Sequence, residues 1–197
     1  MSDQPQRIPV IHAVEALTHA MRVWDEESFR HCVNTAEYAA AIARALGMEG
    51  EAAEQVRIGA LLHDIGKMGV DLGVLKKPGR LDEHEAEHVH LHPGMGAAIL
   101  ERVLPQPIVD CAAAHHEQPD GGGYPRGLRE PQIPLAAMIC RVADVLDSLT
   151  TPQSYRPAMS LEAAMAELRD GAGTRYSAHV VAALAGLIER NELAPAA

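Results

Sequence analysis

The sequence predicts an all-α fold, and two observations carry this prediction. Hydrophobic residues make up 47% of the 197 residues but aromatic residues only 3%, so Ala, Leu, Val, Ile and Met must build the core. Most of these residues are good helix formers. Runs that alternate β-branched and polar residues, as half-buried strands do, are missing. A chain of this length is expected to form one sizeable domain, and no repeat or linker divides it.

The charge balance limits the classes of partner. The formal net charge of −10 argues against binding to a nucleic-acid polymer or to an anionic membrane surface. An anionic substrate remains compatible with this charge if metal ions supply local positive charge. No signal peptide opens the chain and no apolar run could span a bilayer, so a cytoplasmic location is expected. The cysteines are expected to be reduced, buried thiols: Cys32, Cys111 and Cys140.

Apolar residues at helical spacing place the first three helices. A polar tail with two prolines precedes a helix over residues 10–23. A second helix is expected over residues 25–46, with Gly47 after its end, and a third over residues 51–65. By domain, residues 1–22 form the tail and first helix, and residues 23–197 are expected to form one structural unit.

The middle of the chain is more polar. Residues 68–81 contain two glycines and a Lys-Pro-Gly turn, which predicts a connector. A helix over residues 82–91 lacks an apolar stripe, so its histidines are interpreted as solvated: His84, His88 and His90. Pro93 disfavours a helical conformation at His92 and suits the first turn of a helix over residues 93–103. Gly94 and Gly96 should allow close backbone approach there.

Four further helices complete the prediction. They are expected over residues 107–116, 134–150, 161–170 and 178–191. Ser160 is expected to cap the helix over residues 161–170, and Gly171 is expected to end it. Ser177 is expected to cap the helix over residues 178–191. Between the first two of the four lies the most irregular stretch, residues 118–134, with four glycines and four prolines.

His63-Asp64, at the end of the third predicted helix, is the strongest chemical signal. Imidazole nitrogen and carboxylate oxygen are both lone-pair donors near neutral pH, and together they suit a divalent metal. Neighbouring helical residues point about 100° apart, so both side chains reach one ion only near a helix end or bend. Gly66 supplies that end, and Lys67 places a cation one turn from the carboxylate.

Other polar side chains stand where helices end or interrupt apolar faces. Asp144 lies among apolar residues and therefore needs a cation, a metal or several donors as its partner. Glu27 and His31 are four residues apart and share a helix face, which fits either two metal ligands or a solvated pair. The loop with Tyr124 directly follows two histidines, a place where binding residues are common, although an ordinary surface loop is the alternative.

Five segments form an ordered pattern: HDIGK (63–67), KPGRL (77–81), HPGMG (92–96), HHEQPDGGGYP (115–125) and RVADVLDSLT (141–150). Taken in order, these segments resemble the HD superfamily of metal-dependent phosphohydrolases, and more specifically the HD-GYP family of cyclic di-GMP phosphodiesterases. The resemblance covers about residues 23–190 and implies a single HD-type helical bundle with a metal centre in its core.

The resemblance also implies roles for the matching residues. Asp64 would bridge two metals and, with Lys67, act in catalysis, and Glu27 matches a position that holds a third metal in some members. The implied cofactors are two or three divalent ions, iron or manganese, as suits a ligand set without thiolates. The two-metal ligands would be His31, His63, Asp64, His92, His115, His116 and Asp144. The substrate contacts would be Lys67, Gly123, Tyr124 and Arg156.

The implied function is hydrolysis of cyclic di-GMP to linear pGpG or GMP, with metals activating water for attack on phosphorus. One alternative is an HD phosphohydrolase that acts on another nucleotide. A second is a non-catalytic module that binds a cyclic dinucleotide or a partner protein. A second copy of the chain or a regulatory protein supplied in trans are the partners to consider.

Three positions depart from the family pattern. The family commonly has arginine and valine where this chain has Asn34 and Thr35. Gln153 replaces an arginine that contacts the nucleotide in the family, which bears on substrate affinity or substrate choice.

Overall fold

The computed structural model describes residues 9–152 and 157–193, and these form ten α-helices and one 3₁₀ helix without a strand. The all-α prediction is confirmed. The first helices are α1 (Val10–Trp24), α2 (Glu26–Ala45), α3 (Gly50–Leu62), the 3₁₀ helix η1 (Ile65–Gly69), α4 (Leu72–Leu75) and α5 (Glu83–Val89). The others are α6 (His92–Leu100), α7 (Gln106–Ala114), α8 (Leu135–Thr150), α9 (Leu161–Asp170) and α10 (Ala178–Glu189).

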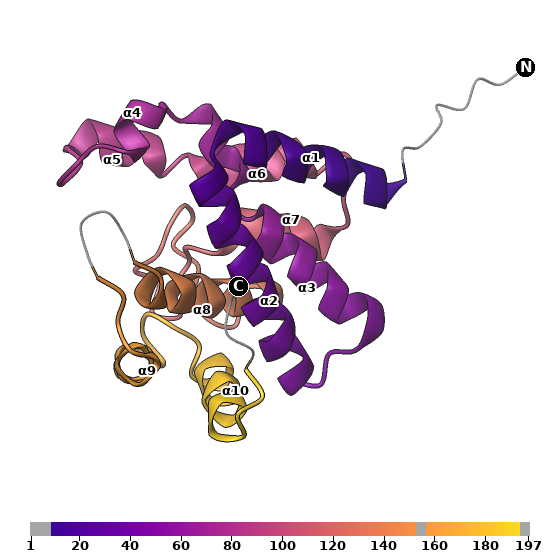
Figure 1. The fold of residues 1–197 in the computed structure, drawn as a ribbon, viewed down its shortest axis with the longest axis vertical. Helices are drawn as coiled ribbons and strands as arrows, with labels where there is room; N and C mark the ends of the chain where they lie inside the picture. The colour runs from indigo at the N-terminus through magenta and orange to yellow at the C-terminus, as the bar shows by residue number, and fades with distance from the viewer. Residues whose placement is uncertain (1–8, 153–156, 194–197) are drawn as a thin grey trace, which may run out of the picture.

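A central group of helices carries the site residues (Figure 1). Helix α2 packs against α3 and α8, and α3 also packs against α7. Helix α6 contacts both η1 and α7. Helices α9 and α10 lie at one end of the molecule, while α4 and α5 lie together at the other, to the side of α1.

Two hydrophobic clusters form most of the core, and α3 contributes to both. Its residues Val56 and Ala60 join the larger cluster, with α2, α8, α9 and α10. Its residues Ile58 and Leu62 join the smaller cluster, with α1, α6 and α7. The end of α3 is therefore surrounded by apolar residues, where unpaired polar groups are costly.

Helix α3 ends earlier than predicted, at Leu62 and not at Ile65. His63 and Asp64 therefore occupy the turn between α3 and η1, and Asp64 has a non-helical φ of −97° and ψ of 7°. A Cβ added at Gly66 would lie 2.0 Å from the carbonyl oxygen of His92, so only glycine allows η1 to approach α6 this closely.

Several smaller expectations were also settled. The Ser160 side chain caps α9 and Gly47 follows α2 with a φ of +80°, as predicted. Ser177 precedes α10 but does not cap it, because its hydroxyl donates to Glu130 instead.

The predicted connector, residues 68–81, contains the short helix α4. The three cysteines are buried and free, as predicted. Within the described ranges, no helix has the length and apolar character needed to cross a bilayer.

Candidate metal centre

Five separate elements bring polar side chains to one buried place. His31 comes from α2, His92 from the start of α6, and Asp144 from the middle of α8. His63 and Asp64 come from the turn after α3, and His115 and His116 follow α7. Of these residues, His63, Asp64, His92, His115 and Asp144 are buried.

Asp64 belongs to two groups of potential ligands. In each group, one ligand atom per residue lies within 4.8 Å of the others. The first group contains Asp64, His92, His115 and His116, and the second contains His31, His63 and Asp64. Asp144 adjoins the second group, because its Oδ1 lies 3.1 Å from Nε2 of His31. A carboxylate shared by two ligand groups is placed to bridge two ions.

Hydrogen bonds to the backbone orient three of the imidazoles. Nδ1 of His63 lies 2.7 Å from the carbonyl oxygen of Ala60, and Nδ1 of His92 lies 2.7 Å from that of Val89. Nδ1 of His115 lies 2.9 Å from the carbonyl oxygen of Cys111. A carbonyl oxygen only accepts, so each Nδ1 carries a proton, and Nε2 is the nitrogen that each ring can offer to a metal ion. Metal-binding histidines are usually held in this way.

The potential ligand atoms converge on one buried place. Nε2 of His92 lies 3.3 Å from Nε2 of His115, and two lone pairs at that distance repel unless a cation lies near them. Nε2 of His63 and Oδ1 of Asp64 are buried and have no hydrogen-bond partner among the residues that the structure describes. Leaving such atoms unpaired is costly. A set of imidazoles and carboxylates without thiolates therefore fits a divalent metal ion.

The electrostatics keep several ligands in metal-binding form. Burial raises the pKa of Asp64, but His63 and Lys67 outweigh it and hold that pKa well below its usual value. Burial and neighbouring imidazoles lower the pKa of His115, and burial lowers that of His116 to about 3. These rings are thus neutral at physiological pH, and the Asp64 carboxylate is ionised.

His31 differs from those rings, because it lies between two carboxylates. Burial alone lowers its pKa, but Asp144 and Asp147 raise it to about 10. Asp144 in turn has a lowered pKa, because contact with His31 outweighs burial. A metal ion would take the place of the Nε2 proton of His31.

Asp147 is a site residue that sequence reasoning missed. Its Oδ2 lies 2.6 Å from Nδ1 of His31, while its Oδ1 accepts from Nδ2 of Asn34 at 3.0 Å and from the hydroxyl of Thr151 at 3.1 Å. Asp147 therefore fixes the His31 ring, and Asn34 helps to hold Asp147. A signal was available, because Asp147 follows Asp144 by three residues and shares its face of an apolar helix.

Arg141 was also missed, and it weakens the case for His116 as a ligand. Its Nη1 lies 3.3 Å from Nδ1 of His116 and 3.9 Å from Oδ2 of Asp144. A guanidinium only donates, so this contact uses the Nδ1 lone pair and leaves the proton of the neutral ring on Nε2. His116 would have to give up this contact or change tautomer to bind a metal through either nitrogen.

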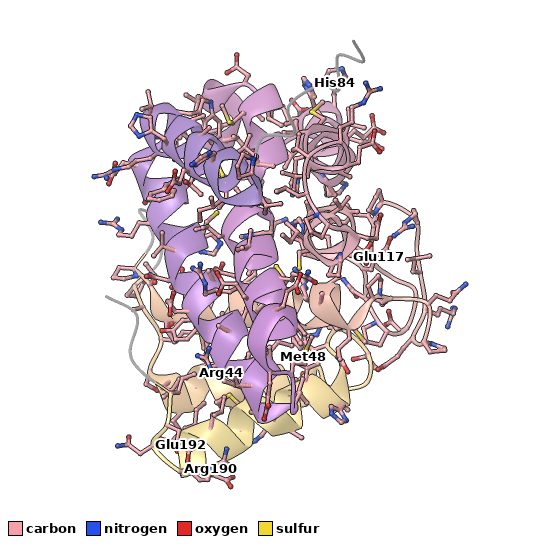
Figure 2. The ribbon with its side chains drawn as sticks, turned by 90° about the vertical axis from the view of Figure 1, so that its right-hand side faces the viewer. Arg44, Met48, His84, Glu117, Arg190 and Glu192 are labelled. Carbon is pink, nitrogen blue, oxygen red and sulfur yellow. The ribbon has the colours of Figure 1, made fainter. Side chains whose placement is uncertain are left out.

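The loop after α7 folds back over the histidines. The Glu117 carboxylate (Glu117 is labelled in Figure 2) accepts from the backbone N–H of Arg126 and of Leu128, both at 2.8 Å. A Cβ at Gly123 would lie 2.4 Å from the backbone nitrogen of Gln118, so only glycine fits there. Tyr124 stacks on His116 with ring centroids 4.6 Å apart. Burial raises the pKa of Tyr124, so its hydroxyl keeps its proton.

Some predicted site residues are not brought together. Glu27 is exposed in the first turn of α2 and belongs to neither ligand group, so its role at a third metal stays a prediction. Arg156 and Gln153 lie outside the described residues. His90 is exposed, as predicted, but its ring also stacks on Tyr124.

Comparison with known proteins identifies the family of the chain. The family model described as HD domain matches residues 11–180. The chain is 35% identical over 178 residues to a Cyclic di-GMP phosphodiesterase of Thermotoga maritima, covering 88% of this chain and 48% of that protein. It is 39% identical over 155 residues to 3′3′-cGAMP-specific phosphodiesterase 3 of Vibrio cholerae, covering 78% of this chain and 34% of that protein. The chain thus spans half or less of the length of these relatives.

A solved structure shares the fold. The HDG"Y"P protein Bd1817 of Bdellovibrio bacteriovorus superposes with a TM-score of 0.66 at 23% identity, covering 81% of this chain and 51% of that one. The family match and the named relatives indicate the same family as two segments of the sequence, residues 63–67 and 115–125. The chain belongs to the HD domain family, and within it to the HD-GYP group.

Proposed function

We propose that this chain is a metal-dependent phosphodiesterase that hydrolyses a cyclic dinucleotide, with cyclic di-GMP as the expected substrate. The observation that carries the proposal is the pair of ligand groups that share Asp64. Two adjacent metal sites are typical of enzymes that hydrolyse phosphodiesters. The names of the Thermotoga and Vibrio relatives support a cyclic dinucleotide as the substrate class.

The metals are proposed to be iron or manganese, with Asp64 shared between them. His31, His63 and Asp144 would hold one ion, and His92 and His115 would hold the other. His116 would join the second set once it gives up its contact with Arg141 or changes tautomer. When bound, they would supply Lewis acidity and an activated water. They would also explain how a chain with a net charge of −10 attracts an anionic substrate.

The chain's own residues would position the substrate and move protons. Lys67 forms an ion pair with Asp64. Burial lowers the pKa of Lys67, but the Asp64 carboxylate outweighs it and raises that pKa, so the ammonium stays charged. Beside the shared carboxylate, it can donate to a phosphate oxygen as negative charge develops there. The Tyr124 hydroxyl, which keeps its proton, is a neutral donor for the same substrate.

A mixed cyclic dinucleotide is the second candidate substrate. The Vibrio relative that is 39% identical is named for 3′3′-cGAMP. Gln153 also lacks the permanent charge and planar fork of the arginine that is common at this position in the family, which could change the choice of base.

The test is product analysis on metal-loaded protein. Protein purified without oxygen and loaded with Mn²⁺ or Fe²⁺ is incubated with cyclic di-GMP or with 3′3′-cGAMP, and the products are separated by chromatography. We expect linear dinucleotide or mononucleotides from at least one substrate, and none with Asp64→Ala. Metal-loaded wild type that hydrolyses neither substrate would contradict the proposal and favour a binding module.

A further inference from the structure

Tyr124 is held between two imidazole rings. His90 stacks on it with centroids 4.1 Å apart and ring planes at 25°, and His116 stacks on it at 4.6 Å and 17°. Among the described aromatic contacts, His90 and His116 do not meet each other. Both imidazoles are nearly parallel to the Tyr124 ring and within stacking distance of it. If they stacked on the same face, they would also contact each other, so they lie on opposite faces. Both faces of Tyr124 are therefore covered.

The two imidazoles have different surroundings. His116 is half-buried beside His92 and His115, whereas His90 is exposed. His90 follows the last residue of α5, and its backbone N–H donates to the carbonyl oxygen of Ala86 at 2.9 Å. It also lies two residues before His92, so its backbone is tied to an element that carries a ligand. The backbone of His90 is therefore held in place, and in the described part of the chain its ring stacks on Tyr124.

We propose that His90 is a positioning residue for Tyr124 in the substrate site. By covering the outer face of the ring, His90 keeps Tyr124 against His116 and prevents a nucleobase from stacking on that face. Tyr124 then meets a cyclic dinucleotide with its edge and its hydroxyl. This inference rests on the proposed function, and it adds a residue that contacts neither the metals nor the scissile phosphate.

The inference predicts an effect on binding and not on the chemical step. The ion pairs that Asp64 and Lys67 form with other described residues do not involve His90, so removal of His90 leaves them in place. Without His90, the ring would be free to tilt away from His116. Loss of one aromatic stack should raise KM for the cyclic dinucleotide about three- to tenfold. The kcat should stay within about twofold, because the loss is in binding that substrate and transition state share.

Three variants separate the stack from other effects. His90→Ala removes the ring, and His90→Phe keeps a ring that can stack without the imidazole nitrogens. His88→Ala is the matched control, since His88 is an exposed histidine on the same helix. We expect a raised KM only in His90→Ala and values near wild type in the other two. An unchanged KM in His90→Ala, or no rescue by His90→Phe, would overturn the inference.

A second readout needs no activity. The protein is labelled with 3-fluorotyrosine, and the ¹⁹F resonance of Tyr124 is assigned by its absence in Tyr124→Phe. Loss of stacking should shift that resonance in His90→Ala and not in His88→Ala. A Tyr124 resonance that does not change in His90→Ala overturns the inference even if wild type proves inactive on every cyclic dinucleotide. Inactive wild type with a shifted resonance would contradict the proposed function alone.

Discussion

Asp64 combines three properties that seldom occur together in one side chain. It is 4% exposed, it forms an ion pair with Lys67, and its Oδ1 has no hydrogen-bond partner. An ion pair with Lys67 would explain the position of one carboxylate oxygen only. It would not explain why Oδ1 is buried at 3.3 Å from Nε2 of His92. A bridging ligand accounts for all three properties.

Replacing Asp64 should separate metal binding from folding. Among the described residues, Asp64 alone belongs to both ligand groups, so we expect Asp64→Ala to lose bound metal and hydrolysis. The fold should persist, because the hydrophobic clusters do not depend on this carboxylate. Elemental analysis, activity and circular dichroism check these outcomes, with Asp170→Ala on α9 as the control. Full metal content with near-normal turnover in Asp64→Ala would show that the two-metal assignment is wrong.

Asp147 should act through His31. Asp147→Asn keeps a similar shape but removes the charge that faces Nδ1 of His31. Loss of such a supporting contact typically weakens metal affinity about 10- to 100-fold. Competition with a chelator measures that affinity, and Asn34→Ala should show a smaller effect in the same direction. Equal affinity in Asp147→Asn and wild type would leave Asp147 as a packing residue.

At the residue scale, the sequence predicted which side chains converge better than it predicted the residues that support them. His63, Asp64, His92 and His115 stand at helix ends, and helix ends can be found from glycine, proline and periodicity. Asp147 and His90 have roles that depend on residues distant in sequence, His31 and Tyr124. Only the tertiary arrangement brings those partners within reach.

The turn between α3 and η1 shows how a single element sets the site. Periodicity predicted a helix through Ile65, because Leu61, Leu62 and Ile65 continue its apolar spacing. The helix ends at Leu62 instead, and η1 packs against α6 through Gly66. Helix propensity gives no information on this contact, since the partner lies about thirty residues further along the chain.

Gly66 and Gly94 offer a paired test of that packing. A Cβ at Gly66 would lie 2.0 Å from the His92 carbonyl oxygen, whereas nothing lies within 4 Å of one at Gly94. Gly66→Ala should destabilise the protein by about 1–3 kcal/mol or more, as overpacking does. Gly94→Ala in α6 should be neutral or stabilising by up to about 1 kcal/mol, because alanine favours the helix. Denaturant unfolding compares them, and equal stabilities would contradict the close approach of η1 to α6.

The start of α2 should respond to pH. Asp25 caps α2, its carboxylate accepts from Ser28, and it forms an ion pair with Lys76 next to α4. Burial raises the pKa of Asp25, but Lys76 and Ser28 outweigh it and lower that pKa below 3.8. The stabilisation is therefore present above pH 3.8 and is lost as pH falls through the lowered folded-state pKa.

The matching variant is Asp25→Asn, which keeps a cap but cannot form the ion pair. Its free energy of unfolding should be below that of wild type near neutral pH and approach it as pH falls below 3.8. Unfolding by urea across that range measures the difference. A difference that does not depend on pH would exclude the Asp25–Lys76 ion pair as its source.

At the scale of the whole molecule, the fold class followed from composition, and the helix list followed from periodicity. The packing order did not follow from either, because one apolar stripe resembles another. Helix α3 has apolar residues on two sides and belongs to both clusters, which places its end between them. Periodicity could not predict that these side chains converge. That prediction came from the resemblance to HD-GYP proteins.

The central claim is that Asp64 bridges two metal ions, and anomalous diffraction from crystals loaded with Mn²⁺ tests it most directly. Data collected on both sides of the manganese absorption edge locate each ion independently of any assumed chemistry. The account predicts two peaks about 3.5–4 Å apart, the spacing of two-metal hydrolytic sites, with one Asp64 oxygen bound to each. His63 and His31 should lie at one peak, and His92 and His115 at the other. A single peak, or two peaks that do not share Asp64, would contradict it.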